Sequence, residues 1–554
     1  MTPRGLPLLL CGIATLLTAP AATQSAEWQW SLEVIGAKNP YIPKPPRAFL
    51  WIPPDCAKVK AVIIGQHNMQ EEPLLEDAAF RQTLAELGIA TIWITPALDN
   101  GAHLADGGGD RFLSLLKEFS QRSGYAELAD APIIPIGHSA LASFPWEFAA
   151  WKPDRTLAVV SLSGQWPYTK TVRERLPPGW TVDGVPGLVT IGEYEWAEGS
   201  KEGAGQRAKH PKLPLTMIAE PGSGHFAPTP AKIALIGLYL RKALAARLPA
   251  DAPESGPIPL TTIDASASGW LYERWRKDQG PTSSPGTVTG QNSYAGDRQQ
   301  SFWAFDGELA KAIDTFGGIY RGRSGQLVGY VQNGKVVPQV KGTHQQVTLA
   351  WLPLADGISF ELSGRFLETV PEGRPEKWVG KVAGSPIDHA ETSDPITIER
   401  ICGPVRRTGP GTFSLAFTRQ GTETPQRSNS IWLVARHPGD SRHKPAEQQA
   451  VLNFPLSNTV GADQKISFPE IPDQVAGTAA AIPLAATSSS GLPVGYYVLE
   501  GPAEIDGGVL RLTTLPPKSK LPITVTVVAW QWGRSIEPKL KTAEPVARSF
   551  LVRR

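Results

Sequence analysis

Residues 131–143 read APIIPIGHSALAS, and this stretch decides the fold that the sequence predicts. A short apolar run ends at Gly137, a serine follows two residues later, and a helical pattern begins at Phe144. A strand, a sharp turn with a serine at its apex and a helix make up a nucleophile elbow, in which a strained turn lifts the hydroxyl clear of the backbone. The segment therefore predicts that Ser139 is presented on such a turn.

One position of this elbow departs from the usual pattern G-x-S-x-G. Residues 137–141 read GHSAL, so Leu141 stands where a final glycine is usual, although small residues follow at positions 142 and 143. Serine is also a preferred residue at a helix N-terminus, where its hydroxyl caps the first turn. Taken alone, the motif leaves Ser139 as either a nucleophile or a capping residue. Its neighbour His138 is interpreted as a packing or hydrogen-bonding residue.

Apolar runs and helical patterns alternate regularly on both sides of the elbow. The apolar runs cover 59–65, 90–95, 133–136, 157–161, 187–191 and 213–218, and the helical patterns cover 74–87, 111–123 and 231–248. Strands that are apolar throughout are buried on both faces, and helices between them mark a parallel sheet. Including β-prone pieces at 28–34 and 48–52, we predict an α/β domain over residues 27–250 with a doubly wound, mostly parallel sheet.

The remainder of the chain is predicted to be β-rich. A stretch at 251–260 that is rich in proline and small residues indicates a linker, and short β-like runs with one helical piece at 307–313 fill residues 261–462. We predict a mostly β domain of unknown role there. Residues 463–554 contain ISFPEIPD, SSGLPVGYYVLEGPAEI and RSFLV, and this pattern resembles bacterial immunoglobulin-like modules. The resemblance implies a small β-sandwich of the kind that serves as a spacer or binding aid.

Length, charge and the N-terminal segment narrow the range of protein classes to which this chain can belong. The chain has 554 residues, too many for one hydrophobic core, and its formal net charge of +2 offers no argument for a nucleic-acid partner. Arg4, an apolar run over 6–17 and the small residues after it predict a signal peptide over 1–26. We therefore expect a secreted, periplasmic or cell-surface protein. No later segment is apolar enough to cross a bilayer.

The cysteines predict no metal site. The chain has three, of which Cys11 falls within the predicted signal peptide. Cys56 and Cys402 lack the nearby histidine or cysteine pattern of a zinc site. They could pair in an oxidising compartment, but they are far apart in sequence, so their pairing stays open. We predict neither a metal ion nor an organic cofactor.

A serine nucleophile needs a base to take its proton and an acid to orient that base. Among nine histidines, only His225 directly follows the last predicted strand of the α/β domain, where such a base is required. Glycines around it would let this loop reach back over Ser139. The loop after the strand at 187–191 reads GEYEW, and its spacing favours Glu195 as the acid, with Glu193 as the alternative.

Two backbone N–H groups must stabilise the oxyanion that forms when a serine attacks a carbonyl group. One is expected from Ala140, directly after the serine. The other is expected from the loop after the strand at 59–65, from either Asn68 or Met69. His67 in the same loop is a candidate for substrate contact or for ordering the loop by hydrogen bonds.

Residues 45–248 resemble the α/β-hydrolase superfamily, near its dienelactone-hydrolase-like and secreted carbohydrate-esterase-like branches. The elbow, the loop at 192–195 and the SGHF sequence around the histidine carry the resemblance, with a glutamate where an aspartate is commoner. It implies acyl transfer by Ser139 through an acyl-enzyme, with His225 as the base and Glu195 as the orienting acid. No cofactor is needed for this chemistry.

The substrate class is indicated less directly. Trp166 and Trp196 follow strands at the same edge of the predicted sheet, where aromatic faces suit either sugar rings or simple packing. With a signal peptide and appended β domains, they favour a secreted esterase that removes acyl or methyl-ester groups from a polysaccharide. The alternatives are another secreted hydrolase (a lipase, polyester depolymerase or peptidase) and a non-catalytic surface-binding protein. The sequence leaves the oligomeric state open.

Overall fold

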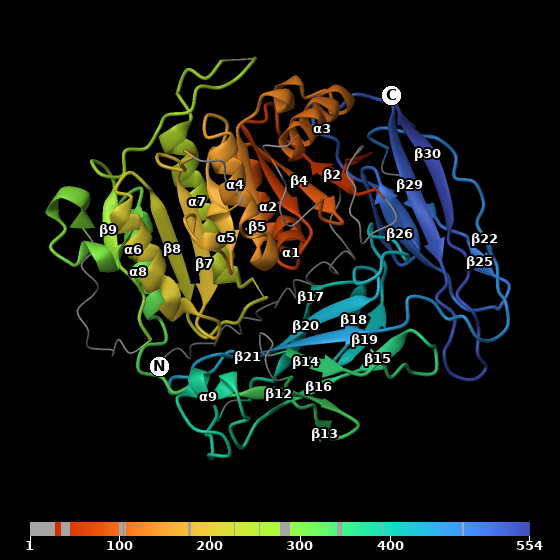
Figure 1. Ribbon diagram of the computed structural model, residues 1–554. Coiled ribbons are helices and arrows are strands. Elements are labelled where there is room, and N and C mark those ends of the chain that lie inside the picture. The colour runs from red at the N-terminus through yellow and green to blue at the C-terminus, as the bar shows by residue number, and fades with distance from the viewer. Residues whose placement is uncertain are drawn as a thin grey trace, which may run out of the picture.

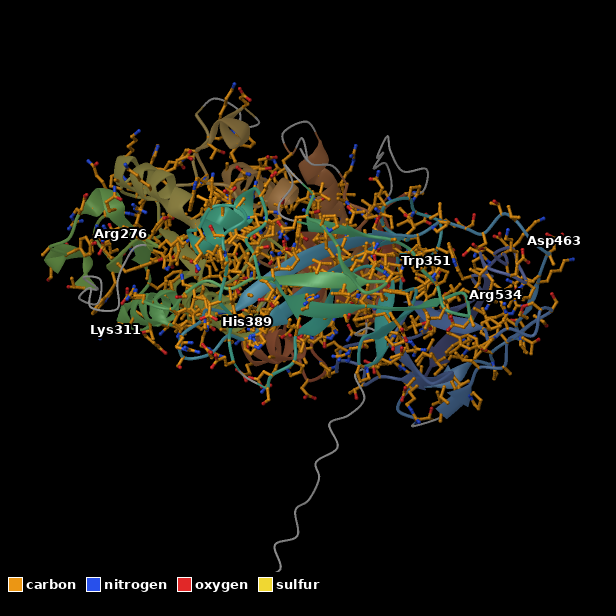
Figure 2. The ribbon with its side chains drawn as sticks, turned by 90° about the horizontal axis from the view of Figure 1, so that it is seen from below. Arg276, Lys311, Trp351, His389, Asp463 and Arg534 are labelled. Atoms are coloured by element: carbon orange, nitrogen blue, oxygen red, sulfur yellow. The ribbon has the colours of Figure 1, made fainter. Side chains whose placement is uncertain are left out.

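The computed structural model describes residues 28–34, 45–98, 104, 107–174, 179–226, 228–253, 255–277, 289–340, 346–391, 393–478 and 481–554. The predicted signal peptide lies outside these residues. Figure 1 shows a helix-covered sheet in the upper left, β-rich strands beneath it and a further β-rich part on the right. Seen from below, Arg276 lies toward one end of the molecule, His389 in the middle and Asp463 toward the other end (Figure 2).

The helix-covered part is built on one sheet of eight strands. They are β1 (Trp30–Glu33), β2 (Arg47–Trp51), β3 (Ala61–Gln66), β4 (Ile89–Thr95), β5 (Ile133–His138), β6 (Val159–Leu162), β7 (Gly187–Gly192) and β8 (Leu215–Glu220). Their order in the sheet is β1-β2-β4-β3-β5-β6-β7-β8. β2 is antiparallel to both its neighbours, and the strands from β4 to β8 in this order are parallel to one another. The predicted mostly parallel sheet is therefore confirmed.

Helices cover both faces of this sheet. They are α1 (Glu71–Glu76), α2 (Ala78–Leu87), α3 (Gly108–Ser123), α4 (Phe144–Trp151), α5 (Lys170–Arg173), α6 (Ser200–Lys209) and α7 (Pro230–Arg247). In β3, Ile63 packs in one core with Phe80 of α2, and Ile64 packs in the other core with Phe112 of α3. The predicted helix at 74–87 is two helices, because Asp77 is extended and its carboxylate caps α2 by accepting the Phe80 N–H at 2.8 Å.

Residues as far as 318 belong to this part of the molecule, beyond the boundary predicted at 250–260. β9 (Trp270–Glu273), β10 (Thr289–Gly290) and β11 (Ser301–Ala304) form a small sheet, and α8 (Gly307–Gly318) follows. The Tyr272 hydroxyl accepts the N–H of Met217 in β8 at 2.8 Å and donates to its carbonyl at 2.7 Å. β8 is an edge of the eight-stranded sheet, and covering an edge hides backbone groups that the sheet leaves unpaired.

Residues 328–453 are mostly β, as predicted, and we call them the central β part. Their elements are β12 (Val328–Gln332), β13 (Lys335–Val336), β14 (Gln346–Leu349), β15 (Ser359–Glu361), β16 (Ser363–Phe366), α9 (Arg374–Val379), β17 (Thr397–Cys402), β18 (Val405–Gly409), β19 (Thr412–Leu415), β20 (Ser430–His437) and β21 (Ala446–Asn453). The largest sheet has the order β14-β21-β20-β17. Figure 1 shows β20 and β21 below the helix-covered sheet, with β21 nearer to β7 and β8.

Residues 466–553, the C-terminal β part, form two larger sheets on one shared core. The elements are β22 (Ile466–Ser467), β23 (Gln474–Val475), β24 (Ala481–Pro483), β25 (Thr487–Ser488), β26 (Gly495–Glu500), β27 (Ala503–Asp506), β28 (Val509–Leu512), β29 (Ile523–Trp530) and β30 (Val546–Arg553). The sheets β23-β30-β29-β26 and β24-β28-β27 meet where Val525 and Phe550 pack with Leu510. The predicted β structure is confirmed, and the likeness to an immunoglobulin module stays a prediction.

The C-terminal β part packs against both other parts. The Glu500 carboxylate accepts hydrogen bonds from Arg47 (3.0 Å) and Ser31 (2.7 Å) at the edge of the eight-stranded sheet. Trp530 packs edge-on against Phe417 of the central β part, with ring centres 4.7 Å apart. The three parts therefore form one body in which the C-terminal part is fixed at two places.

Cys56 and Cys402 are both buried, and both are free thiols, so the disulfide left open by the sequence is not formed. Burial raises the pKa of Cys402 to about 12, which keeps this thiol protonated at neutral pH. Among the described residues, no helix is both long enough and apolar enough to span a membrane.

Candidate active site

Ser139 lies directly after β5, on the turn that leads into α4. Its φ of 53° is in the left-handed region, which residues with a side chain seldom adopt, and this is the strain that a nucleophile elbow requires. A Cβ on Gly137 would lie 2.1 Å from the Leu141 carbonyl oxygen, which explains the glycine before the serine. Leu141 is buried, so this elbow accommodates a leucine where a glycine is usual.

The structure brings Ser139, His225 and Glu195 together in one hydrogen-bonded chain. The Ser139 hydroxyl lies 2.8 Å from Nε2 of His225, and Nδ1 of the same ring contacts Oε1 of Glu195. The other carboxylate oxygen accepts the Gly192 N–H at 3.2 Å. The three side chains follow β5, β8 and β7, at the sheet edge where the sequence places them.

Glu195 is ionised although its side chain is only 1% exposed. Burial by itself raises the pKa of this carboxyl, but the His225 ring and hydrogen bonds from Gly192 and Ser163 outweigh burial and hold the pKa below its ordinary value. A carboxylate at Nδ1 favours the tautomer that carries its proton there, so Nε2 can accept the serine proton. The arrangement can therefore produce a nucleophilic serine.

Glu193, the alternative acid, is engaged elsewhere. Its carboxylate accepts hydrogen bonds from Nζ of Lys444 at 2.6 Å and from the Gly222 N–H at 2.9 Å. It therefore ties the loop after β7 to the loop after β8 and to the central β part. Of the two glutamates, Glu195 is the one that contacts His225.

The backbone of His225 is held by side chains from three elements. Its carbonyl oxygen accepts hydrogen bonds from Gln70 (2.6 Å), Ser163 (2.9 Å) and Nε2 of His138 (2.9 Å). Because a carbonyl oxygen only accepts, His138 carries a proton on Nε2. Ser163, directly after β6, also has a left-handed backbone, with φ of 43°. No sequence pattern had pointed to Gln70 or Ser163.

A buried carboxyl group, that of Glu71, joins the loop after β3 to the elbow. It accepts the N–H of Asn68 at 3.2 Å and the N–H of His138 at 2.6 Å. The backbone N–H of Asn68 is engaged in this way, and the second oxyanion donor, predicted from Asn68 or Met69, stays a prediction. Burial raises the pKa of Glu71 to about 8, against the opposing effect of the two N–H groups.

His67 orders the loop after β3 through contacts with β4. It is buried, its ring packs on Trp93, and its Nδ1 shares a 2.7 Å hydrogen bond with the Thr95 hydroxyl. Burial holds the pKa of this ring well below its ordinary value, so it is neutral. The alternative structural role of His67 is therefore observed, and its contact with substrate stays a prediction.

The two tryptophans do not form an exposed platform. Trp166 is 0% exposed, and its ring packs 5.9 Å from the rings of both Trp196 and Phe302. Trp196 is half-buried against the same core. The predicted sugar contact by Trp166 is wrong because Phe302 of β11, which the sequence assigned to another domain, completes a core around it.

An apolar wall beside His225 was not predicted from the sequence. The Phe226 ring packs 4.4 Å from the His225 ring and 4.9 Å from Trp432 of β20. Met69 of the loop after β3 packs on the same cluster, and Trp432 is half-buried. The central β part therefore contributes directly to the surroundings of the candidate triad.

Comparison with known proteins returned solved structures alone, since no family model and no curated protein sequence matches this chain. Dienelactone hydrolase from Anabaena variabilis is 16% identical, with 40% of this chain and 98% of that chain covered and a TM-score of 0.28. Est1E from Butyrivibrio proteoclasticus is 18% identical, with 39% and 99% covered and a TM-score of 0.28. S-formylglutathione hydrolase from Staphylococcus aureus is 14% identical, with 41% and 97% covered and a TM-score of 0.27.

The chain's own geometry defines the class of fold independently of these matches. A mostly parallel sheet covered by helices on both faces carries a strained serine turn after β5. An acid and a histidine follow the serine in chain order, each on a loop after a later strand. These features together are those of the α/β-hydrolase fold.

Proposed function

We propose that this protein is a serine ester hydrolase in which Ser139 is the nucleophile, His225 the base and Glu195 the orienting acid. The observation that carries the proposal is the continuous chain of contacts from the Ser139 hydroxyl through the imidazole to a buried carboxylate. The serine is also partly exposed on a strained turn, so a substrate can reach it.

The first half of the reaction forms an acyl-enzyme. Ser139 attacks the ester carbonyl while His225 takes its proton on Nε2, and Glu195 stabilises the imidazolium. The backbone N–H groups of Ala140 and of either Asn68 or Met69 stabilise the negative oxygen of the tetrahedral intermediate. The intermediate collapses, the C–O bond to the alcohol breaks, and His225 returns the proton to the departing alcohol.

The second half regenerates the serine. Water loses a proton to His225 and attacks the acyl carbon, and the bond between that carbon and Ser139 then breaks. The serine recovers its proton from His225, and the free acid leaves. Ser139 and His225 act in both halves of the cycle, and no step of this mechanism uses a cofactor.

For the substrate, we propose an acyl or methyl ester carried on an extracytoplasmic polysaccharide. The support is the leader-like segment at 1–26, the two appended β parts and an aromatic side chain, Trp432, next to Phe226. Trp166 no longer supports it. Release of acetate or methanol from acetylated or methyl-esterified polysaccharides tests this point, and hydrolysis of small esters alone would contradict it.

The reaction class is tested with p-nitrophenyl acetate and a fluorophosphonate label on the parent and on Ser139→Ala. We expect hydrolysis and labelling in the parent and a loss of several orders of magnitude in the variant. Ser268→Ala is the matched control, because Ser268 is exposed and its hydroxyl bonds only a local carbonyl, that of Asp264, at 2.7 Å. A parent that neither hydrolyses nor labels would indicate a binding protein on this scaffold, and equal activity in both variants would reject Ser139.

A further inference from the structure

Strand β21 of the central β part lies along the loop that carries His225. Alternate residues of a strand point to one face, and here Glu447 and Gln449 both point to this loop. The Glu447 carboxylate accepts the Gly224 N–H at 2.8 Å. With its amide oxygen toward the loop, Gln449 accepts the N–H groups of His225 (2.9 Å) and Phe226 (2.8 Å). One strand therefore holds three consecutive backbone amides around the base.

The residues just before this strand hold the loop of the acid. Nζ of Lys444 donates to the Glu193 carboxylate at 2.6 Å, and the Pro445 carbonyl accepts the Tyr194 hydroxyl at 2.5 Å. Glu193 and Tyr194 directly precede Glu195 in the chain. The same short segment of the central β part thus contacts both the acid loop and the base loop.

This contact leaves little room for a side chain at two positions of the loop, Gly222 and Gly224. A Cβ on Gly224 would lie 2.6 Å from the Gln449 amide, and a Cβ on Gly222 would lie 3.0 Å from Pro445. The sequence suggested that these glycines give the loop its reach over the serine. The structure gives another reason, which is the close approach of a strand from a different part of the molecule.

Glu447 is itself fixed by a buried ion pair. Nε of Arg436 donates to its second oxygen at 2.7 Å, and the Glu447 side chain is 5% exposed. Arg436 also pairs with Glu399 of β17 at 3.2 Å, on a more exposed side. A paired and hydrogen-bonded carboxylate in a buried place is held in one orientation, because moving it would leave a charge unpaired.

We propose that Glu447 and Gln449 are positioning residues, which set the backbone of the base loop so that the His225 ring meets both Ser139 and Glu195. The central β part is then an obligatory component of the active site. This inference rests on the proposed function, since it concerns the same three side chains. A misplacement of about 1 Å at such a site can lower the rate about a hundredfold.

The test compares Gln449→Leu with Gln448→Leu in the full-length protein. The two variants carry the same change at adjacent positions on opposite faces of β21, and the Gln448 amide contacts Gln339 instead of the loop. We expect Gln449→Leu to lower kcat about tenfold or more with KM changed less than about threefold, and Gln448→Leu to stay within about threefold of the parent. Equal kcat values for the two folded variants would overturn the proposal.

A measurement without turnover separates this proposal from the proposed function. We expect the His225 proton on Nδ1, in close contact with Glu195, to give a downfield proton NMR signal that reports the geometry of the pair. We expect Gln449→Leu to move or abolish this signal and Gln448→Leu to retain it. A signal that is unchanged in both would overturn the positioning role. An inactive parent whose signal still responds to Gln449→Leu would contradict the esterase proposal and support the positioning role.

A second pair of variants covers the case in which Gln449→Leu does not fold. Glu447→Gln keeps the shape of the side chain but weakens the acceptor that faces Gly224. Glu399→Gln makes the same change at another carboxylate that pairs with Arg436, on β17 instead of β21. We expect a fall in kcat of about tenfold for Glu447→Gln alone. Equal activity in these two variants, or equal loss, would overturn the role of Glu447.

Discussion

Two residues of the site, Ser139 and Ser163, have left-handed backbones at the ends of adjacent parallel strands. Such a conformation costs on the order of 1–3 kcal/mol for a residue with a side chain. Ser139 directs its hydroxyl to His225 Nε2, and Ser163 directs its hydroxyl to the His225 carbonyl oxygen. At the scale of single residues, two strained serines therefore contact one histidine, one at its ring and the other at its backbone carbonyl.

Substitutions of the two glutamates after β7 should distinguish two roles, the orientation of the His225 ring and the support of the loop that follows β7. Glu195→Gln places an amide at Nδ1 of His225, which favours the wrong tautomer, so we expect kcat to fall by about 10³- to 10⁴-fold. Glu193→Gln weakens the contact with Lys444 and should cost much less, about tenfold. Steady-state hydrolysis of p-nitrophenyl acetate measures both. A larger loss in Glu193→Gln than in Glu195→Gln would reverse the assignment of the acid.

The pKa of Glu71, raised by burial to about 8, predicts how stability depends on pH. At a pH between the ordinary pKa of a glutamate and about 8, the folded protein holds a proton that the unfolded chain has lost. The contribution of Glu71 to the free energy of unfolding is therefore full at low pH and is lost as the pH rises through 8. Glu71→Gln removes that dependence. The unfolding temperature of the parent, relative to the variant, should fall between about pH 5 and about pH 9. A difference that is independent of pH would show that Glu71 is ionised in the folded state.

At the scale of elements, the elbow depends on how closely β5 and α4 approach. The Gly137 backbone lies so close to the Leu141 carbonyl that a side chain on Gly137 would collide with it. Position 141, where the usual pattern has its second glycine, holds a buried leucine in this chain. Only one of the two small positions in the usual pattern is therefore required by the contacts in this chain. The departure from the pattern reflects local packing and does not open the turn.

Gly137→Ala tests this interpretation of the elbow. The added methyl group would meet a backbone oxygen at 2.1 Å, so we expect the soluble folded yield and the esterase activity both to collapse. Gly205→Ala is the matched control, because nothing lies within 4 Å of that position in α6. It should leave the protein unchanged or stabilise it by up to about 1 kcal/mol. Circular dichroism and thermal unfolding of both variants give the comparison.

Much of the α/β part could be predicted from periodicity, because its strands are apolar throughout and its helices have one apolar side. Ser139 and His225 could be predicted from their places at strand ends, whereas spacing favoured Glu195 and left Glu193 as the alternative acid. Contacts between distant segments could not be found in this way. The burial of Trp166 depends on Phe302, and the support of His225 depends on Gln449, and neither leaves a local pattern in the sequence.

At the scale of the whole molecule, every two of the three parts have an interface between them. The central β part holds the loops of the acid and the base, and the C-terminal β part contacts both Arg47 of the sheet edge and Phe417 of the central part. Each part therefore contacts the other two, and we expect the chain to unfold as a coupled unit.

Trp530→Ala should show this coupling. The ring is 5% exposed and packs against Phe417, so its loss leaves a cavity at the interface and should cost about 3–5 kcal/mol. We expect one unfolding transition at a lower temperature, observed alike by tryptophan fluorescence and by loss of esterase activity. Val475→Ala, at a side chain that is 51% exposed, should change stability by less than about 0.5 kcal/mol. A separate early transition that spares activity would contradict the coupling.

The place of β21 in the chain has a consequence for how the protein is made. A nascent chain emerges from its N-terminus, and early domains generally fold first. The nucleophile, acid and base are all complete by His225, but the strand that holds the base loop is synthesised about 220 residues later. Activity should consequently be absent from a ribosome-bound chain that has folded its α/β sheet, and should arise only once β21 has emerged and docked. The ordering would delay hydrolysis until synthesis is nearly finished.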